Sequence, residues 1–154
     1  MKPFVITVIW LFAVLMYSCK TNTAEFALSY SLECVDSYKV VLRVSSDRHY
    51  VLEEYNYFFD NFEKKKDPIT RQGILNNGEF RKISRLIRQS NILSLPDYYE
   101  SHQKIDKGNF LYQFAFKSGG SEKYVFLREI NRDQLPEPFF HLLQDMTRLS
   151  TELK

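Results

Sequence analysis

Alternating apolar and polar side chains predict extended backbone over much of this chain. From Glu25 to Glu33 every second residue is apolar, and these residues are Phe26, Leu28, Tyr30 and Leu32. A two-residue period is typical of a strand with one buried face. Similar segments run from Tyr38 to Ser45 and from His49 to Tyr57, joined by the polar turn at 45–48. We expect these two segments to form a hairpin.

Three further segments in the second half of the chain have strand character. Ile69 to Leu75 is the expected fourth strand. Asn109 to Lys117 places four aromatic residues on one face, and Glu122 to Glu129 follows it. The intervening Ser118-Gly119-Gly120 predicts a tight turn, because glycine accepts the backbone angles that such turns require. The last two segments therefore predict a second hairpin.

Two segments have helical rather than two-residue spacing. Asn76 is followed three residues later by Glu79, which has the form of a capping box and predicts a helix from about Asn77 to Gln89. Pro96 prevents its continuation. Pro136 and Pro138 suit the first turn of a last helix. Its apolar stripe consists of Phe139, Leu142, Leu143, Met146, Leu149 and Leu153.

The order of these elements predicts an α+β fold. We expect β-β-β-β-α-β-β-α, with an antiparallel sheet of about six strands and two helices on one face of it. The 136 residues after position 18 are enough for one hydrophobic core. Residues 25–154 are therefore expected to form a single domain.

The first 19 residues have a different pattern. Lys2 precedes an apolar run from Phe4 to Tyr17, which is short for a membrane span and typical of a signal peptide. The following Met16-Tyr17-Ser18-Cys19 resembles the lipobox of bacterial lipoproteins, although that motif prefers leucine at the first of these positions and a small residue at the second. The resemblance implies that residues 1–18 are removed, that Cys19 is diacylated and usually acylated again, and that residues 19–24 are a lipidated tether.

Two alternatives to lipidation remain open from the sequence. The apolar run could stay uncleaved as a signal anchor, or cleavage could occur further on, for example after Ala24. In the lipoprotein interpretation the domain is held at the bacterial cell envelope and faces the periplasm or the exterior. We expect the outer membrane rather than the inner one.

The mature part also resembles two known groups. The segment NILSLPDYY after the first helix, together with an aromatic hairpin closed by SGG, resembles small secreted bacterial domains of unknown function from about Ser31 to Leu149. Members of that group typically open with CxGxCPxY, whereas this chain has Glu33-Cys34-Val35-Asp36-Ser37-Tyr38. The order of helix, Leu-Pro link, hairpin and helix is also similar to emfourin-type metalloprotease inhibitors, which implies inhibition as an alternative function.

Charge and motifs narrow the classes of function. Of the 21 basic residues, Lys2 lies in the signal segment, which leaves 20 against 19 acidic residues and gives no support for nucleic-acid binding. No spacing typical of a zinc site, phosphate loop or nucleophile elbow occurs. Glu53 and Glu54 are neighbours on a strand, so they should point to opposite faces. Cys34 is expected to be buried and inert. We therefore expect no enzymatic activity, metal or cofactor.

Two surface features remain as candidate binding sites. Aromatic residues rimmed by charge gather at the end of the first hairpin, and they are Tyr55, Tyr57, Phe58, Phe59 and Phe62. Such a cluster either fills the core or forms a protein-binding patch. The first helix carries a basic face made of Arg81, Lys82, Arg85 and Arg88, which is either a solvated surface or a contact for anionic headgroups or an acidic protein. The expected function is binding of an envelope protein by a membrane-anchored module.

Overall fold

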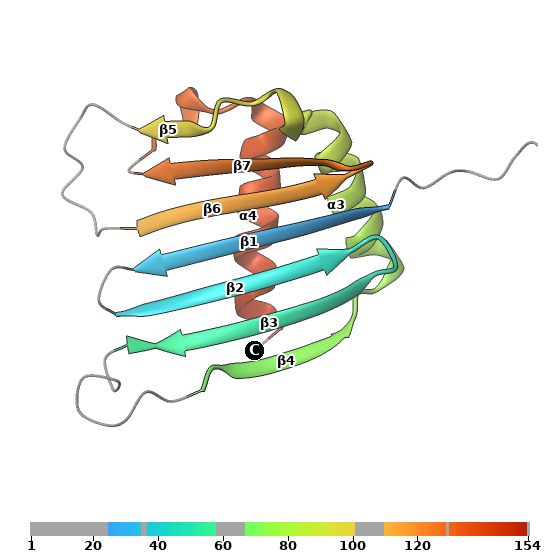
Figure 1. Cartoon of the computed structure of the whole chain (residues 1–154), viewed down its shortest axis with the longest axis vertical. Helices are drawn as coiled ribbons and strands as arrows, with labels where there is room; N and C mark the ends of the chain where they lie inside the picture. The colour runs from blue at the N-terminus through green and yellow to red at the C-terminus, as the bar shows by residue number, and fades with distance from the viewer. Residues whose placement is uncertain (1–24, 35–36, 58–66, 101–109, 129, 154) are drawn as a thin grey trace, which may run out of the picture.

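In the residues that the computed structural model describes, one sheet has two α-helices behind it (Figure 1). The structure describes residues 25–34, 37–57, 67–100, 110–128 and 130–153. The strands within these residues are β1 (Phe26–Cys34), β2 (Tyr38–Ser45), β3 (His49–Asn56), β4 (Ile69–Ile74), β5 (Tyr98–Glu100), β6 (Phe110–Ser118) and β7 (Ser121–Arg128). The α-helices are α3 (Asn77–Ser90) and α4 (Glu137–Glu152), and the 3-10 turns are η1 (Ile92–Ser94) and η2 (Arg132–Gln134).

The strands follow the order β4-β3-β2-β1-β6-β7-β5 across the sheet. All neighbours are antiparallel except β5 and β7, which run parallel. The first strand therefore lies at the centre, between the two hairpins β2–β3 and β6–β7. The predicted α+β class, the two hairpins and the pair of helices are confirmed.

The seventh strand, β5, is the element that the sequence pattern missed. Its three residues follow Pro96 and extend the sheet beyond β7. Such a short segment cannot show a two-residue period, so tertiary contacts decide its conformation. Tyr98 stacks on Phe126 with ring centroids 5.2 Å apart, and on the other face Tyr99 lies 6.3 Å from Phe139.

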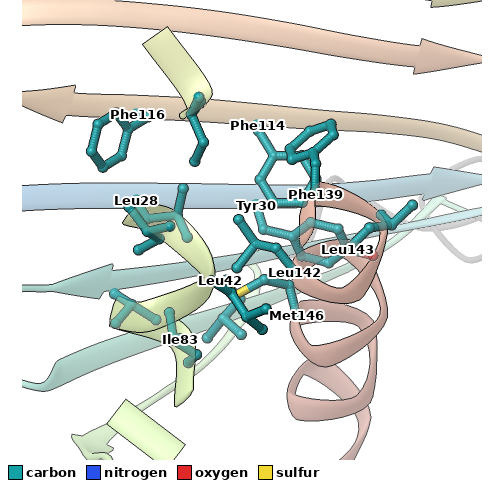
Figure 2. Packing of buried hydrophobic residues seen from close by; sticks show 14 of the residues in the cluster. Leu28, Tyr30, Leu42, Ile83, Phe114, Phe116, Phe139, Leu142, Leu143 and Met146 are labelled. Atoms are coloured by element: carbon teal, nitrogen blue, oxygen red, sulfur yellow. The ribbon is translucent and has the colours of Figure 1, made fainter. Parts of the chain in front are cut away.

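One face of the sheet packs against both helices and forms the core. Alternate residues of the strands point toward α3 and α4, among them Tyr30 on β1 and Phe114 on β6, neither of which is exposed to solvent. Figure 2 shows Phe114 and Phe139 side by side in this layer. Their ring centroids are 5.0 Å apart. The Tyr30 hydroxyl is 2.8 Å from Thr147 Oγ1 of α4, so a polar group deep in the core keeps a partner.

Local sequence signals explain how several elements begin and turn. Asn76 caps α3 by accepting a hydrogen bond from the Glu79 amide (2.9 Å), as the capping box predicted. Gly119 and Gly120 both have positive φ, which is the conformation of a two-residue I′ hairpin turn. Gly73 lies within β4 and pairs with Tyr50, whose ring crosses it, so a Cβ there would lie 2.9 Å from the ring.

The two ends of the sheet differ in the strand ends, turns and helix that lie there. At the N-terminal end β1 begins beside both hairpin turns, since Phe26 pairs with Ser118 and Ala27 with Ser45. Helix α3 lies behind this end (Figure 1), and the Phe80 ring stacks on Phe26 at 6.1 Å. At the opposite end β1 finishes, β6 begins, and β3 finishes at Asn56.

Candidate interaction surfaces

The face of the sheet opposite the helices is covered by no other element of the described residues, and we call it the open face (Figure 1). Its centre is lined by short side chains of β1 and β6, so the surface is hollowed there. The hollow is a groove of about 150 Å³. Its lining residues are Ser29, Ser31, Lys39, Val41, Gln113 and Ala115.

Aromatic side chains border this groove on the side of β7 and β5. Tyr98, Tyr124 and Phe126 form what we call the aromatic ridge. Tyr98 is 73% exposed and Tyr124 is 44% exposed, even though both present large apolar rings. Exposed aromatic area of this kind is enriched in binding surfaces. The open face therefore combines a ridge and a groove along neighbouring strands.

Charged side chains border the groove on the side of β2 and β3. Arg43 donates two hydrogen bonds to the Glu53 carboxylate, at 2.8 and 3.0 Å, and the Tyr55 hydroxyl donates a third at 3.0 Å. The Arg43 hydrogen bonds hold the pKa of Glu53 below its ordinary value. The hydrogen bond to Glu53 in turn raises the pKa of Tyr55. This cluster is a fixed polar border that stays charged at neutral pH.

The predicted aromatic cluster is only partly described. Tyr55 lies half-buried on the open face at the end of β3, and Tyr57 follows the strand with its ring centroid 6.5 Å from that of Tyr55. The Tyr57 amide donates to the Ser37 carbonyl at 2.9 Å, which fixes its backbone beside β2. Neither ring belongs to the core cluster. Phe58, Phe59 and Phe62 lie outside the described residues.

The structure divides the predicted basic face of α3. Arg81, Arg85 and Arg88 are exposed, and none of them forms an ion pair with another residue that the structure describes. Lys82 lies toward α4, where its Nζ is 2.6 Å from Oδ1 of Asp145. The unpaired positive charge of the helix is therefore the arginine stripe, defined as Arg81, Arg85 and Arg88.

Two further predictions concern the directions of Glu53 and Glu54 and the burial of Cys34. Glu53 and Glu54 do point to opposite faces, because Glu53 binds Arg43 on the open face while Glu54 accepts from Arg71 at 2.6 Å on the other. Cys34, expected to be buried, is half-buried because it ends β1, and it forms no disulfide in the described part of the chain.

The described residues contain neither a candidate membrane span nor a candidate metal site. No helix there is long and apolar enough to cross a membrane. No group of three or more His, Cys, Asp or Glu side chains in the same residues could hold a metal ion. Cys19, the predicted lipidation site, lies outside the described residues.

Comparison with known proteins assigns no family to this chain. No family model matches it, and no curated protein matches its sequence. The resemblances to lipoproteins, to secreted domains and to metalloprotease inhibitors therefore stay predictions.

Sequence reasoning missed the aromatic ridge, although a signal for it was present. The residues Tyr124-Val125-Phe126-Leu127 are apolar without interruption. In an antiparallel strand with one solvated face, polar residues would alternate with apolar ones. The uninterrupted run therefore indicated that both faces of β7 are apolar, with Val125 and Leu127 in the core and the two aromatic residues on the open face.

Proposed function

We propose that this protein is a non-catalytic lipoprotein of the bacterial envelope. One end of its sheet lies close to the membrane, and the opposite end binds an envelope protein. The observation that carries the proposal is the separation of the two ends of the sheet. The chain enters β1 at one end, and Tyr55 and Tyr57 lie at the other. An anchor before residue 25 would keep the first end near lipid and leave the second accessible.

The length of the tether supports this orientation. Lys20 to Ala24 are five residues, which at about 3.4 Å each reach roughly 17 Å. The N-terminal end of the sheet would then stay close to the lipid headgroups. Helix α3 lies at that end and carries the arginine stripe, whose charges are without acidic partners in the described residues. Each arginine near an anionic surface contributes about 1 kcal/mol.

The opposite end supports a binding role. Tyr55 and Tyr57 lie outside the core cluster, and their packed rings offer apolar area beside the Arg43–Glu53 pair. Tyrosine is enriched at protein interfaces because its rigid ring adds apolar contact while its hydroxyl still makes a hydrogen bond. The proposed partner is therefore an envelope protein that contacts this end.

The anchor is tested by mass spectrometry of the native protein and of Cys19→Ala. We expect acyl groups on an amino-terminal Cys19, and an unprocessed, unacylated precursor in the variant. Detection of a wild-type chain that begins after Ala24, or one that keeps residues 1–18, would replace the lipoprotein by ordinary cleavage or by a signal anchor.

The binding end is tested by site-specific photocrosslinking in intact cells. A photoreactive residue in place of Tyr57 should yield one defined crosslinked protein. The same residue in place of Gln89, which is exposed on α3 at the other end, is the matched control. Equal crosslinking from both positions, or none from position 57, would contradict a partner at the far end.

The metalloprotease-inhibitor alternative makes a different prediction. The purified chain would slow a secreted metalloprotease at stoichiometric amounts, with or without its lipid. Inhibition of one enzyme in a panel would favour that alternative, and an envelope crosslink with no inhibition would favour the anchored binding module.

A further inference from the structure

The charges on the open face follow an order across the strands that pairs opposite signs when the row is placed against its own reverse. At the end of the sheet where β1 finishes, Nζ of Lys39 on β2 is 3.2 Å from Oε2 of Glu33 on β1. Two strands further on, Arg128 on β7 is 3.9 Å from Glu100 on β5. Leu111 on β6 lies between the two pairs and is 37% exposed. Across the strands the row is therefore positive, negative, apolar, positive, negative.

The shape of the open face is also complementary to itself, because a groove on one side of β6 matches a ridge on the other. The groove lies over β1 and the aromatic ridge over β7, on either side of β6. In register, Ser31 and Phe126 flank Gln113, and Ser29 and Tyr124 flank Ala115. Small side chains on one side of β6 thus match large aromatic side chains on the other.

We infer that a second copy of this chain packs on the open face, around a two-fold axis that runs parallel to β6. Such an axis exchanges β1 with β7 and β2 with β5. The ridge of each copy then fills the groove of the other, and Gln113 and Ala115 meet their own counterparts on the axis. A two-fold interface is isologous, so one self-complementary surface is sufficient to form it.

The same axis brings opposite charges together. Lys39 faces Glu100 of the second copy, and Glu33 faces Arg128, so the two ion pairs meet with their signs reversed. Lys117 meets its own counterpart, and its cross-strand neighbour Glu122 supplies the opposite charge on each copy. Facing sheets cross at about 30°, so the axis is tilted from β6 by about half that angle; the outer strands are displaced most, but the side chains there are long and can follow the displacement.

The orientation of the axis also agrees with anchoring in one membrane, and this step rests on the proposed lipidation. An axis parallel to the strands keeps the N-terminal ends of both copies on the same side. Five strands about 4.8 Å apart, over about six residues, give roughly 500 Å² on each copy. Stable dimers bury about 800 Å² on each partner, so association is weak in dilute solution and is favoured when both copies share a membrane surface.

Cysteine crosslinking on the axis tests the pairing. Gln113→Cys and Ala115→Cys, each with Cys34→Ala to remove the native thiol, should be joined into a dimer when membranes of expressing cells are treated with a short bifunctional thiol reagent, because facing sheets lie about 10 Å apart, which is too far for a direct disulfide. Thr70→Cys lies on the open face but on β4, outside the overlap, and is the matched control. Crosslinking of the axis variants no stronger than that of the control would overturn the dimer.

Charge exchange between copies tests the register. Lys39→Glu places like charges opposite each other twice in its homodimer, and so does Glu100→Lys. Mixing the two variants restores opposite charges at both places. We expect each homodimer to be roughly fivefold weaker than wild type and the mixed dimer to recover. Weakening without recovery on mixing would contradict the proposed axis.

The outcomes separate this inference from the proposed anchor. Acylated protein without axis crosslinks would leave the lipoprotein standing and remove the dimer. Axis crosslinks in concentrated Cys19→Ala protein would support the dimer whether or not the wild type is acylated. Wild type that stays monomeric in the membrane, while Ala115→Arg loses an envelope crosslink and Thr70→Arg keeps it, would assign the open face to a different protein.

Discussion

The two faces of the sheet come from the same strands but have opposite chemistry. The face that meets α3 and α4 is filled with fully buried aliphatic and aromatic side chains. The open face alternates serine, alanine, glutamine and ion pairs with a few exposed aromatics. One face is therefore sufficient to stabilise the fold, because it supplies the apolar burial. The residues of the other face are consequently available for binding.

The sharpest test of this difference compares two neighbours on β6. Phe114 is fully buried and packs on Tyr30 and Phe139, with ring centroids 5.3 and 5.0 Å away, whereas Gln113 lies on the open face. Phe114→Ala should lower the free energy of unfolding by about 3–5 kcal/mol, because it removes apolar contacts and leaves a cavity. Gln113→Ala should change it by less than about 0.5 kcal/mol. Denaturant unfolding of both variants measures the contrast.

A large loss from Gln113→Ala would show that the open face also carries stability. The dimer would then be the first cause to examine, because Gln113 lies on the proposed axis. The measurement is therefore repeated over a range of protein concentrations, since only an effect through association depends on concentration.

The contrast between the faces also explains what could be predicted from the sequence. Alternation found β1, β2 and β6 because one face of each is buried, and the spacing of Phe80, Ile83 and Ile87 found α3 for the same reason. The turns before β3 and β7 indicated those two strands, whereas β4 has no buried residue. β5 was missed because three residues have no period. The central place of β1 was not predicted, since the pattern within a strand does not determine its neighbours. The glycine in β4 became interpretable only when Tyr50 was seen to cross it.

The candidate site was less predictable than the fold. Residues on the open face have no common sequence pattern, because what they share is a cross-strand register between segments as distant as Lys39 and Arg128. The basic stripe of α3 was visible in the sequence since helical spacing is local. That Lys82 belongs to a pair with Asp145 depends on how α4 packs, and only the structure supplies it.

Substitutions on the two sides of α3 should have an effect of intermediate size on the free energy of unfolding. The Asp145 side chain is 9% exposed, and Lys82 is its closest cationic partner in the described residues, with Arg148 Nε at 3.9 Å. Lys82→Met keeps the aliphatic part of the side chain but removes the positive charge closest to the nearly buried Asp145 carboxylate. We expect a loss of about 1–2 kcal/mol, less than for a fully buried pair because Lys82 is itself 48% exposed.

Arg85→Met on the exposed side is the matched control for Lys82→Met. Arg85 has no ion-pair partner among the described residues, so the free energy of unfolding should stay within about 0.5 kcal/mol. Thermal and denaturant unfolding provide the comparison. Equal losses from both variants would mean that the arginine stripe supports the fold, which would weaken its assignment to the lipid surface.

The smallest expected effect is the pH dependence of the open face. The pKa of Glu53 is lowered in the folded state, first by the hydrogen bonds from Arg43. The contribution of the pair is therefore present above the ordinary glutamate pKa of about 4.3 and is lost as the pH falls through the lowered folded value. Because Arg43 is 50% exposed, solvent limits this contribution to a few tenths of a kcal/mol.

Glu53→Gln should thus lose stability at pH 7 and approach wild type in acid. Glu122→Gln, which removes an open-face carboxylate that accepts from Tyr124 instead, is the control. A constant difference between Glu53→Gln and wild type from pH 7 to pH 3 would mean that packing, rather than charge, sets the role of Glu53 on this face.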